Sequence, residues 1–172
     1  RIQDSDSKYY LASAAIGYSI MQTPLNMVTF YNAIANNGKM MKPYLVESHE
    51  KNGKTVKKFD PEILNGSVCS KATADSLTRA LTMVTLEGTA ATKLRNAKCV
   101  VAGKTGTARV VLNKEDNPKK GDPYVSVDGL RRYQATFVGF FPADEPKYTA
   151  IVVVYTRPTK GSVYGGVIPA KT

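Results

Sequence analysis

The stretch Gly103-Lys104-Thr105-Gly106-Thr107 decides how the rest of the chain is interpreted, and three interpretations compete for it. A phosphate-binding loop ends in Gly-Lys-Thr, but it also needs a glycine five residues before Gly103, where this chain has Lys98. It also needs a helix to follow, whereas residues 107–112 are rich in residue types typical of strands. The phosphate-loop interpretation is therefore rejected.

The second interpretation is structural, a strand with glycine kinks and a surface lysine. The third is a substrate-binding strand in a serine acyl-transfer enzyme. In such a strand a fixed lysine ammonium lowers the energy of nearby anions, and a threonine hydroxyl beside it donates to a substrate carboxylate. A glycine leaves the strand edge open to an extended peptide, and the N–H after it points at a developing oxyanion. The stretch by itself leaves these two interpretations open.

The residues around this stretch predict strands. Residues 99–102 lead into it, and residues 110–112 follow it. Residues 134–141 and 148–155 are apolar runs rich in β-branched and aromatic side chains. The turn Pro142-Ala143-Asp144-Glu145-Pro146 joins these two runs, so we expect them to pair as antiparallel strands.

The first half of the chain predicts a helix followed by a hairpin. Thr23-Pro24 begins the helix with a capping hydroxyl and a proline at the first helical position, and Asn37-Gly38 ends it. An extended segment then runs through Tyr44-Leu45-Val46. The two-residue turn Asn52-Gly53 joins that segment to a second strand at residues 55–59.

A second helix is predicted between a capping Ser70 and Gly88, and Thr89-Ala90-Ala91-Thr92 opens one further helical turn. The apolar face of this helix is expected to consist of Leu77, Ala80, Leu81 and Val84. Helices in the first half and strands in the second predict an α+β fold, with an antiparallel sheet and helices packed on it. A length of 172 residues fits one domain.

Composition and charge limit the class of protein. With 42% hydrophobic and 22% charged residues, the chain is not disordered, collagen-like or a coiled coil. No apolar run is long enough to span a bilayer. The net charge of +10 admits a nucleic-acid partner, an acidic surface or a basic face made for an absent part of the protein. No nucleic-acid-binding motif accompanies that charge.

Neither the cysteines nor the histidine predict a metal site. Cys69 and Cys99 are expected to be free buried thiols rather than a disulfide, because their spacing fits neither a zinc site nor a redox motif. His49 lies in a polar stretch, so we expect it to be exposed to solvent. Without a second histidine or a carboxylate cluster, we expect neither a metal nor a cofactor.

A resemblance over nearly the whole chain supports the third interpretation of the Lys-Thr-Gly stretch. Residues 83–90 followed by 102–108 resemble a pair of segments in class B penicillin-binding proteins, and the division-specific branch is the most similar. Four further segments look like the same family in the same order: Ile16-Gly17-Tyr18 with Thr23-Pro24-Leu25, residues 31–38 before Lys42-Pro43, residues 137–144, and Tyr164-Gly165-Gly166.

The resemblance implies part of a penicillin-binding transpeptidase or β-lactamase-like fold. It implies a D,D-transpeptidase of the cell envelope, whose periplasmic domain is anchored to the cytoplasmic membrane by an N-terminal segment absent from this chain. Such an enzyme cross-links peptidoglycan stem peptides ending in D-Ala-D-Ala through a serine acyl-enzyme, which β-lactam antibiotics trap. Other cell-division and cell-wall proteins are expected as partners, and nucleic acid is not.

The same resemblance implies roles for four residues. Lys104 is the catalytic residue that supports proton movement and pairs with the substrate carboxylate. The hydroxyls of Thr105 and Thr107 bind that carboxylate, and the backbone N–H of Thr107 is an oxyanion donor. Gly106 permits the close approach of the substrate.

The sequence departs from the family in its nucleophile. The family needs a Ser-x-x-Lys at a helix start and a Ser-x-Asn on a loop, and no Ser-x-Asn occurs in this chain. Ser5-Asp6-Ser7-Lys8 and Ser48-His49-Glu50-Lys51 match the first motif, but no apolar helix follows either one, so both are rejected. Both ends of the chain also look cut. We therefore expect residues 1–172 to be the C-terminal part of a single transpeptidase domain, inactive alone because the N-terminal part with the nucleophile is missing.

Rival functions remain at this point. A β-lactam-sensing receptor domain and a β-lactamase share the Lys-Thr-Gly motif. A non-enzymatic basic interaction module or nucleic-acid-binding module is a rival from another class, suggested by charge alone. The polar segment 113–128 is predicted to be a long loop, which is either a solvent loop or a rim of the substrate cleft.

Overall fold

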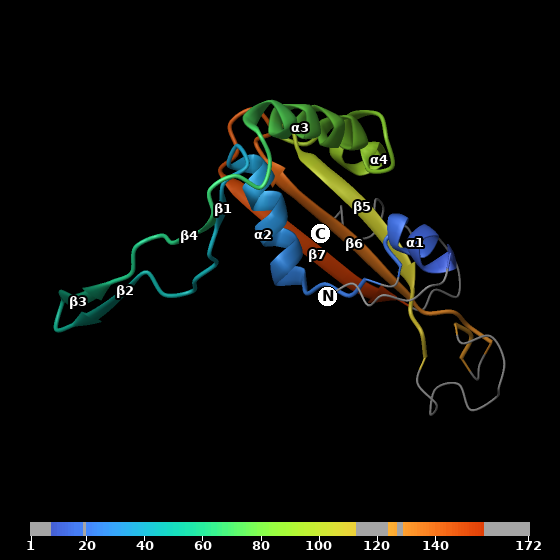
Figure 1. Cartoon of the computed structure of the whole chain (residues 1–172), viewed down its shortest axis with the longest axis horizontal. Helices are drawn as coiled ribbons and strands as arrows, with labels where there is room; N and C mark the ends of the chain where they lie inside the picture. Colours follow the sequence, from blue (N-terminus) through green and yellow to red (C-terminus); the bar gives the residue numbers. More distant parts are fainter. Residues whose placement is uncertain (1–7, 19, 113–123, 127–128, 157–172) are drawn as a thin grey trace.

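A three-stranded antiparallel sheet forms the centre of the molecule (Figure 1). The computed structural model describes residues 8–18, 20–112, 124–126 and 129–156. The strands are β5 (Ala102–Arg109), β6 (Tyr133–Phe141) and β7 (Tyr148–Thr156), in the order β5-β6-β7. The predicted α+β fold and the antiparallel pairing of the two apolar runs are confirmed.

The Lys-Thr-Gly stretch lies within β5. Lys104 is opposite Val138 of β6, and Gly106 is opposite Thr136. The strand is shorter than the sequence indicates, because residues 110–112 lie beyond its end. Val110 still donates its N–H to the Arg132 carbonyl at 3.0 Å, so the ladder continues for one residue past the strand.

Helix α2 (Pro24–Ala35) crosses β6 and β7, as Figure 1 shows. It begins as predicted, with the Thr23 hydroxyl accepting the Asn26 N–H at 3.1 Å. Its buried residue Ile34 packs with Ala102, Phe140 and Ala143 into the core cluster. A side-chain hydrogen bond from Asn32 to Thr149 of β7 also joins the helix to the sheet.

Helix α3 (Lys71–Leu86) lies against β5 and is followed by the short helix α4 (Ala91–Leu94), and both were predicted. The apolar face predicted for α3 is partly wrong. Leu77 and Ala80 are exposed, whereas Ala74 and Thr85 are buried. A hydrophobic pattern misses Thr85 because its side chain is polar. Thr85 is nevertheless fully buried. Its hydroxyl can be buried without loss because it hydrogen-bonds to backbone carbonyls, including that of Val101 just before β5.

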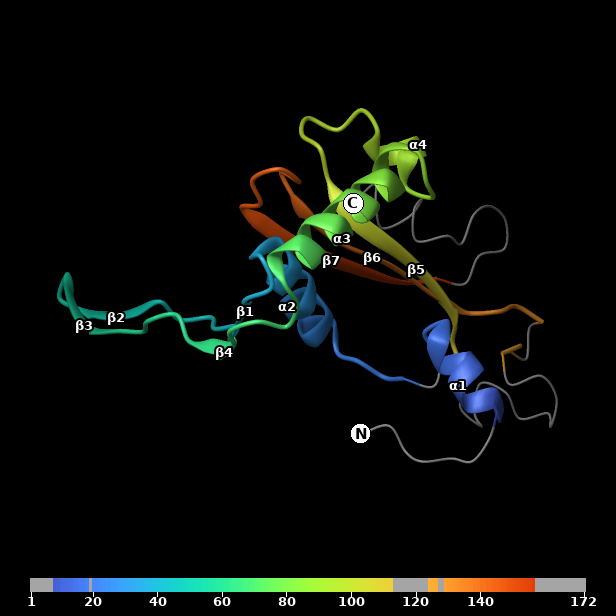
Figure 2. The ribbon, with the colours of Figure 1, turned by 45° about the horizontal axis from the view of Figure 1, so that its top comes forward.

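A long arm projects from the body between α2 and α3 (Figures 1 and 2). Its outer part is the hairpin of β2 (Ser48–Lys51) and β3 (Lys54–Lys58), and its base pairs β1 (Met40–Met41) with β4 (Ile63–Asn65). The predicted turn is confirmed, with Asn52 and Gly53 at φ +53° and +72°.

The first strand of the hairpin is not where the sequence places it. It begins at Ser48, whereas Tyr44-Leu45-Val46 are exposed and outside any strand, with Leu45 fully exposed. Pro61 explains the interruption, because a proline has no N–H to donate to a ladder, and the segment facing residues 44–46 contains it.

Several smaller expectations are settled by the described residues. Cys69 and Cys99 are free, but both are half-buried rather than buried, and His49 is exposed and stacks edge-on against Phe59. The predicted loop 113–128 lies mostly outside the described residues. Helix α1 (Lys8–Ala15) was not predicted. None of the helices in the described part of the chain is long and apolar enough to cross a membrane.

Candidate functional site

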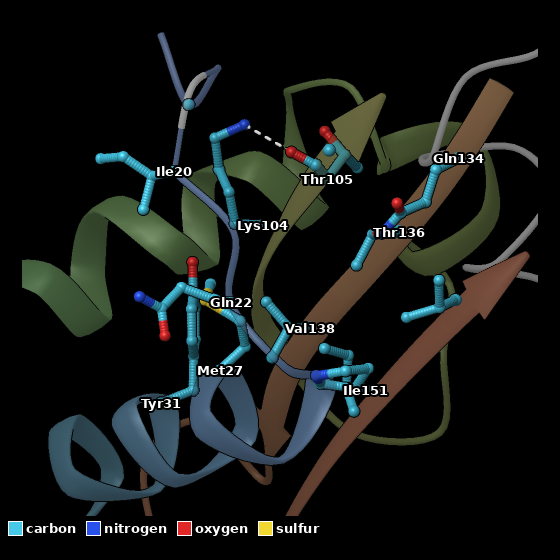
Figure 3. A pocket seen from close by; sticks show the side chains of 14 residues that line it. Ile20, Gln22, Met27, Tyr31, Lys104, Thr105, Gln134, Thr136, Val138 and Ile151 are labelled. Atoms are coloured by element: carbon cyan, nitrogen blue, oxygen red, sulfur yellow. Dashed lines mark hydrogen bonds between the residues drawn. The ribbon is translucent and has the colours of Figure 1, made fainter. Parts of the chain in front are cut away.

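The Lys104 side of β5 opens into a cavity of about 350 Å³ between the sheet and the segment that runs into α2 (Figure 3). Lys104 and Gly106 contribute to it from β5, and Met27 and Tyr31 contribute from α2. Thr105 of β5 and Pro24 at the start of α2 also line it. The remaining lining residues come from β6, β7 and the chain before α2: Gln134, Thr136, Val138, Ile151, Val153, Gly17, Ile20 and Gln22. The cavity therefore has a mainly apolar floor and a single cation among its lining residues.

Lys104 is exposed and lies on one side of this cavity, facing Tyr31 across it (Figure 3). Its ammonium Nζ donates to the backbone carbonyl of Thr105 at 2.8 Å. None of the described residues that line the cavity is acidic, so the positive charge of Lys104 suits an anionic ligand. Burial raises the pKa of the Tyr31 phenol above its ordinary value, so this side chain is a neutral hydroxyl at physiological pH.

The hydrogen bonds at the end of β5 show which of its residues direct their backbone N–H and C=O groups away from β6, toward the outer edge of the sheet. Val110 donates toward β6, and in an antiparallel ladder the direction alternates from one residue to the next. The N–H and C=O groups of Thr105 and Thr107 therefore face the outer edge. The Arg109 N–H agrees with this alternation, because it donates outward to the Tyr18 hydroxyl at 3.4 Å.

Thr105 is half-buried, and its hydroxyl is 2.8 Å from the hydroxyl of Thr89, in the turn between α3 and α4. Thr107 is exposed one ladder step farther along the same edge. Lys104, Thr105, Gly106 and Thr107 thus form a continuous polar strip on β5, and the first three of these residues line the cavity.

The two glycines of the stretch differ in what surrounds them. A Cβ at Gly103 would lie 2.5 Å from the Phe137 ring and 2.8 Å from the Val138 carbonyl oxygen, so packing alone requires glycine there. A Cβ at Gly106 would meet only the Thr136 Cβ, at an ordinary 3.8 Å. The described structure has room for a side chain at residue 106, so the chain's own packing gives no reason for a glycine at that position.

The Ser-x-x-Lys match at Ser48 is not brought to this site. Ser48 and Lys51 lie in the β2–β3 hairpin, which projects away from the sheet (Figures 1 and 2). The other match differs from expectation, because helix α1 begins at its Lys8, whereas the sequence indicated no helix after it; Ser5 itself lies outside the described residues. No cluster of three or more potential metal-ligating side chains is present in the part of the chain that the structure describes.

This strip and cavity belong to a known type of domain. Residues 3–171 match the family described as penicillin binding protein transpeptidase domain. The chain belongs to this family. Penicillin-binding protein 2A of Bacillus subtilis is 33% identical over 151 residues, which is 84% of this chain and 20% of that protein. The peptidoglycan D,D-transpeptidase FtsI of Escherichia coli K12 is 29% identical over 161 residues, covering 92% of this chain and 23% of that protein.

A solved member of the penicillin-binding protein family has the same fold. Penicillin-binding protein A from M. tuberculosis, in its ceftriaxone acyl-enzyme complex, superposes with a TM-score of 0.71 at 26% sequence identity. The match covers 96% of this chain and 34% of that one. This chain therefore spans about a third of that structure and less than a quarter of the length of the two curated relatives.

Sequence reasoning found the strip of this transpeptidase domain but missed its surroundings. Met27 and Tyr31 fall within the helix predicted between Thr23 and Gly38, and Gln134 and Thr136 fall within a predicted strand, but none of the four was predicted to line a site. Thr89 was assigned to a helical turn, whereas α4 is capped at Ala90 without a side-chain hydrogen bond. No local pattern predicts these contacts, because each depends on how distant segments pack together.

Proposed function

We propose that residues 1–172 are the C-terminal part of the transpeptidase domain of a peptidoglycan D,D-transpeptidase, a class B penicillin-binding protein of the division-specific type. Its serine attacks the D-Ala–D-Ala bond of a stem peptide, forms an acyl-enzyme with the penultimate residue and releases the terminal D-Ala. An amine of a neighbouring stem then takes the acyl group and frees the serine. The observation that carries the proposal is the Lys104–Thr107 strip, on an edge strand beside an apolar cavity in a member of this family.

The strip suits a ligand that ends in a carboxylate. Lys104 supplies a positive charge in a cavity without acidic side chains, and the hydroxyls of Thr105 and Thr107 supply donors beside it. The Thr107 N–H faces the outer edge, the direction in which an oxyanion of a peptide lying along that edge would develop. Because Gly106 has no side chain, a peptide could approach the backbone of β5 closely at this position. Such an approach would explain the glycine, which the packing of the chain itself does not require.

The proposal places the nucleophile outside these 172 residues, because they contain no Ser-x-Asn and because Ser48-His49-Glu50-Lys51 forms a strand of the projecting hairpin rather than a helix start. The isolated chain is then expected to form no covalent adduct with a labelled penicillin. The longer protein is expected to be a periplasmic enzyme with a membrane anchor upstream, working with other cell-division and cell-wall proteins. Its depletion should block septation while cell elongation continues.

Acylation of the full-length protein by a labelled penicillin tests the assignment. We expect a single serine adduct, located by peptide mass spectrometry outside residues 1–172. Lys104→Ala should slow acylation by roughly 100-fold or more, the loss typical of removing one preorganised charge or donor at a reacting centre. Lys98→Ala is the matched control, because Lys98 is also exposed but does not line the cavity. An adduct on Ser48, or equal rates for Lys104→Ala and wild type, would contradict the proposal.

Product analysis separates the transpeptidase from its rivals. A transpeptidase yields cross-linked stem-peptide dimers and free D-Ala. A β-lactam-sensing receptor is acylated without forming dimers, and a β-lactamase releases hydrolysed drug. A basic interaction module is not acylated at all.

A further inference from the structure

The hydroxyl of Thr105 has a side-chain partner that comes from a different part of the chain. Thr89 Oγ1 and Thr105 Oγ1 are 2.8 Å apart, although the two residues are 16 positions apart in the sequence. Thr89 lies in the turn between α3 and α4, where a threonine would commonly cap the following helix. It does not do so here, because its side chain reaches β5 instead.

The turn that carries Thr89 is fixed on both sides. Gly88 donates to the Met83 carbonyl at 2.9 Å, and Ala90 donates to the Val84 carbonyl at 3.1 Å. Ala90 is fully buried. The end of α3 is also joined to the start of β5, because the buried Thr85 hydroxyl donates to the Val101 carbonyl. Thr89 is therefore held at the end of a helix that is itself hydrogen-bonded to the segment leading into β5.

The number of protons sets the direction of this hydrogen bond once a ligand is bound. A threonine hydroxyl has one proton to donate and two lone pairs that accept. If Thr105 gives its proton to Thr89, it has none for a carboxylate. If Thr89 donates to Thr105, the Thr105 proton is free to point at an anion, and the chain of donors strengthens that contact.

We propose that Thr89 is a positioning residue for carboxylate recognition: it donates to the Thr105 hydroxyl and so directs the Thr105 proton at the carboxylate of the peptide or β-lactam. This inference rests on the proposed function, which assigns Thr105 to that carboxylate. Thr89 acts through Thr105, so its contribution should depend on both the Thr105 hydroxyl and the negative charge of the ligand.

The test uses the full-length protein and measures the second-order rate constant of acylation by a penicillin and by the methyl ester of the same penicillin, which lacks the negative charge. Thr89→Val removes the hydroxyl with little change of shape and should slow acylation by the free acid about three- to tenfold, the effect of one net hydrogen bond. Thr89→Ser keeps the hydroxyl and should restore most of the rate. Thr92→Val is the matched control, since Thr92 is exposed on α4 and outside the cavity.

Two further measurements separate positioning from mere folding. Thr89→Val should leave acylation by the ester unchanged, and it should have no further effect in a Thr105→Val background. Equal slowing for ester and acid, additive effects in the double variant, or an unchanged rate with the acid would each overturn the inference while leaving the proposed function intact. If the wild-type protein is not acylated, or Thr105→Val has no effect, the proposed function fails and this inference fails with it.

Discussion

The two glycines of the Lys-Thr-Gly stretch should respond in opposite ways to the same added methyl group. Alanine at residue 103 places a Cβ 2.8 Å from the Val138 carbonyl oxygen and 2.5 Å from the Phe137 ring. The ring can shift, but the carbonyl belongs to β6, opposite Lys104 in the ladder, and moves only with that strand. Alanine at residue 106 meets nothing closer than the Thr136 Cβ at 3.8 Å.

These distances set the expected sizes of the two effects. Overpacking of a tight site costs about 1–3 kcal/mol, so Gly103→Ala should destabilise the protein by that amount. At roughly 2–4 °C per kcal/mol for a domain of this size, the melting temperature should fall by about 2–12 °C. Gly106→Ala should leave stability unchanged or raise it by up to about 1 kcal/mol, because alanine reduces the freedom of the unfolded chain.

The assay compares full-length wild type, Gly103→Ala and Gly106→Ala by thermal unfolding and by acylation rate with a labelled penicillin. Gly106→Ala should keep its melting temperature and lose acylation, because the proposed ligand passes where the new methyl group stands. Gly103→Ala should instead show a lower melting temperature than wild type. The reasoning is refuted if Gly106→Ala unfolds as early as Gly103→Ala, or if it is acylated as fast as wild type.

The remaining predictions concern stability. Thr85→Val should destabilise by about 1–3 kcal/mol in urea unfolding, because it leaves the Val101 carbonyl without its buried donor, whereas Thr85→Ser should recover most of the loss. Ser70→Ala should cost about 1 kcal/mol, since it removes the acceptor of the Thr73 N–H at the start of α3, and an unchanged urea midpoint would count against the cap. The raised pKa of the Tyr31 phenol means that the unfolded state loses this proton first, so wild type should lose stability as pH rises above about 10 more steeply than Tyr31→Phe does, and parallel pH profiles would contradict this.

Local chemistry explains which elements the sequence predicted. Thr23-Pro24 and Ser70 are capping signals that act within one helical turn, and Asn52-Gly53 satisfies a hairpin turn by its own backbone angles. The strands β6 and β7 were predictable because long runs of β-branched and aromatic residues favour strands. The Lys104–Thr107 strip was singled out because its residue types are informative together, and its role in ligand binding stays a prediction.

Contacts between distant segments explain what the sequence did not predict. The pairing of β1 with β4 joins the two ends of the arm, and nothing local to Met40 or Ile63 indicates it. Thr85 lies on the buried stripe of α3 because Val101 accepts its proton, so a rule that counts apolar residues places the face of that helix wrongly. The partnership of Thr89 with Thr105 escaped prediction for the same reason.

The bonds at the two ends of β5 limit the length of any chain that pairs along its outer edge. The Val101 carbonyl is already engaged by Thr85 before the strand begins, and the Arg109 N–H is engaged by Tyr18 at its end. Between these stops, Gly103 is buried and the Thr105 carbonyl accepts from the Lys104 ammonium, so the exposed part of the edge is short. A partner strand at this edge has room for only a ladder step or two. The shortness of this edge disfavours pairing with a long β-strand and so limits edge-to-edge association of the sheet with other proteins.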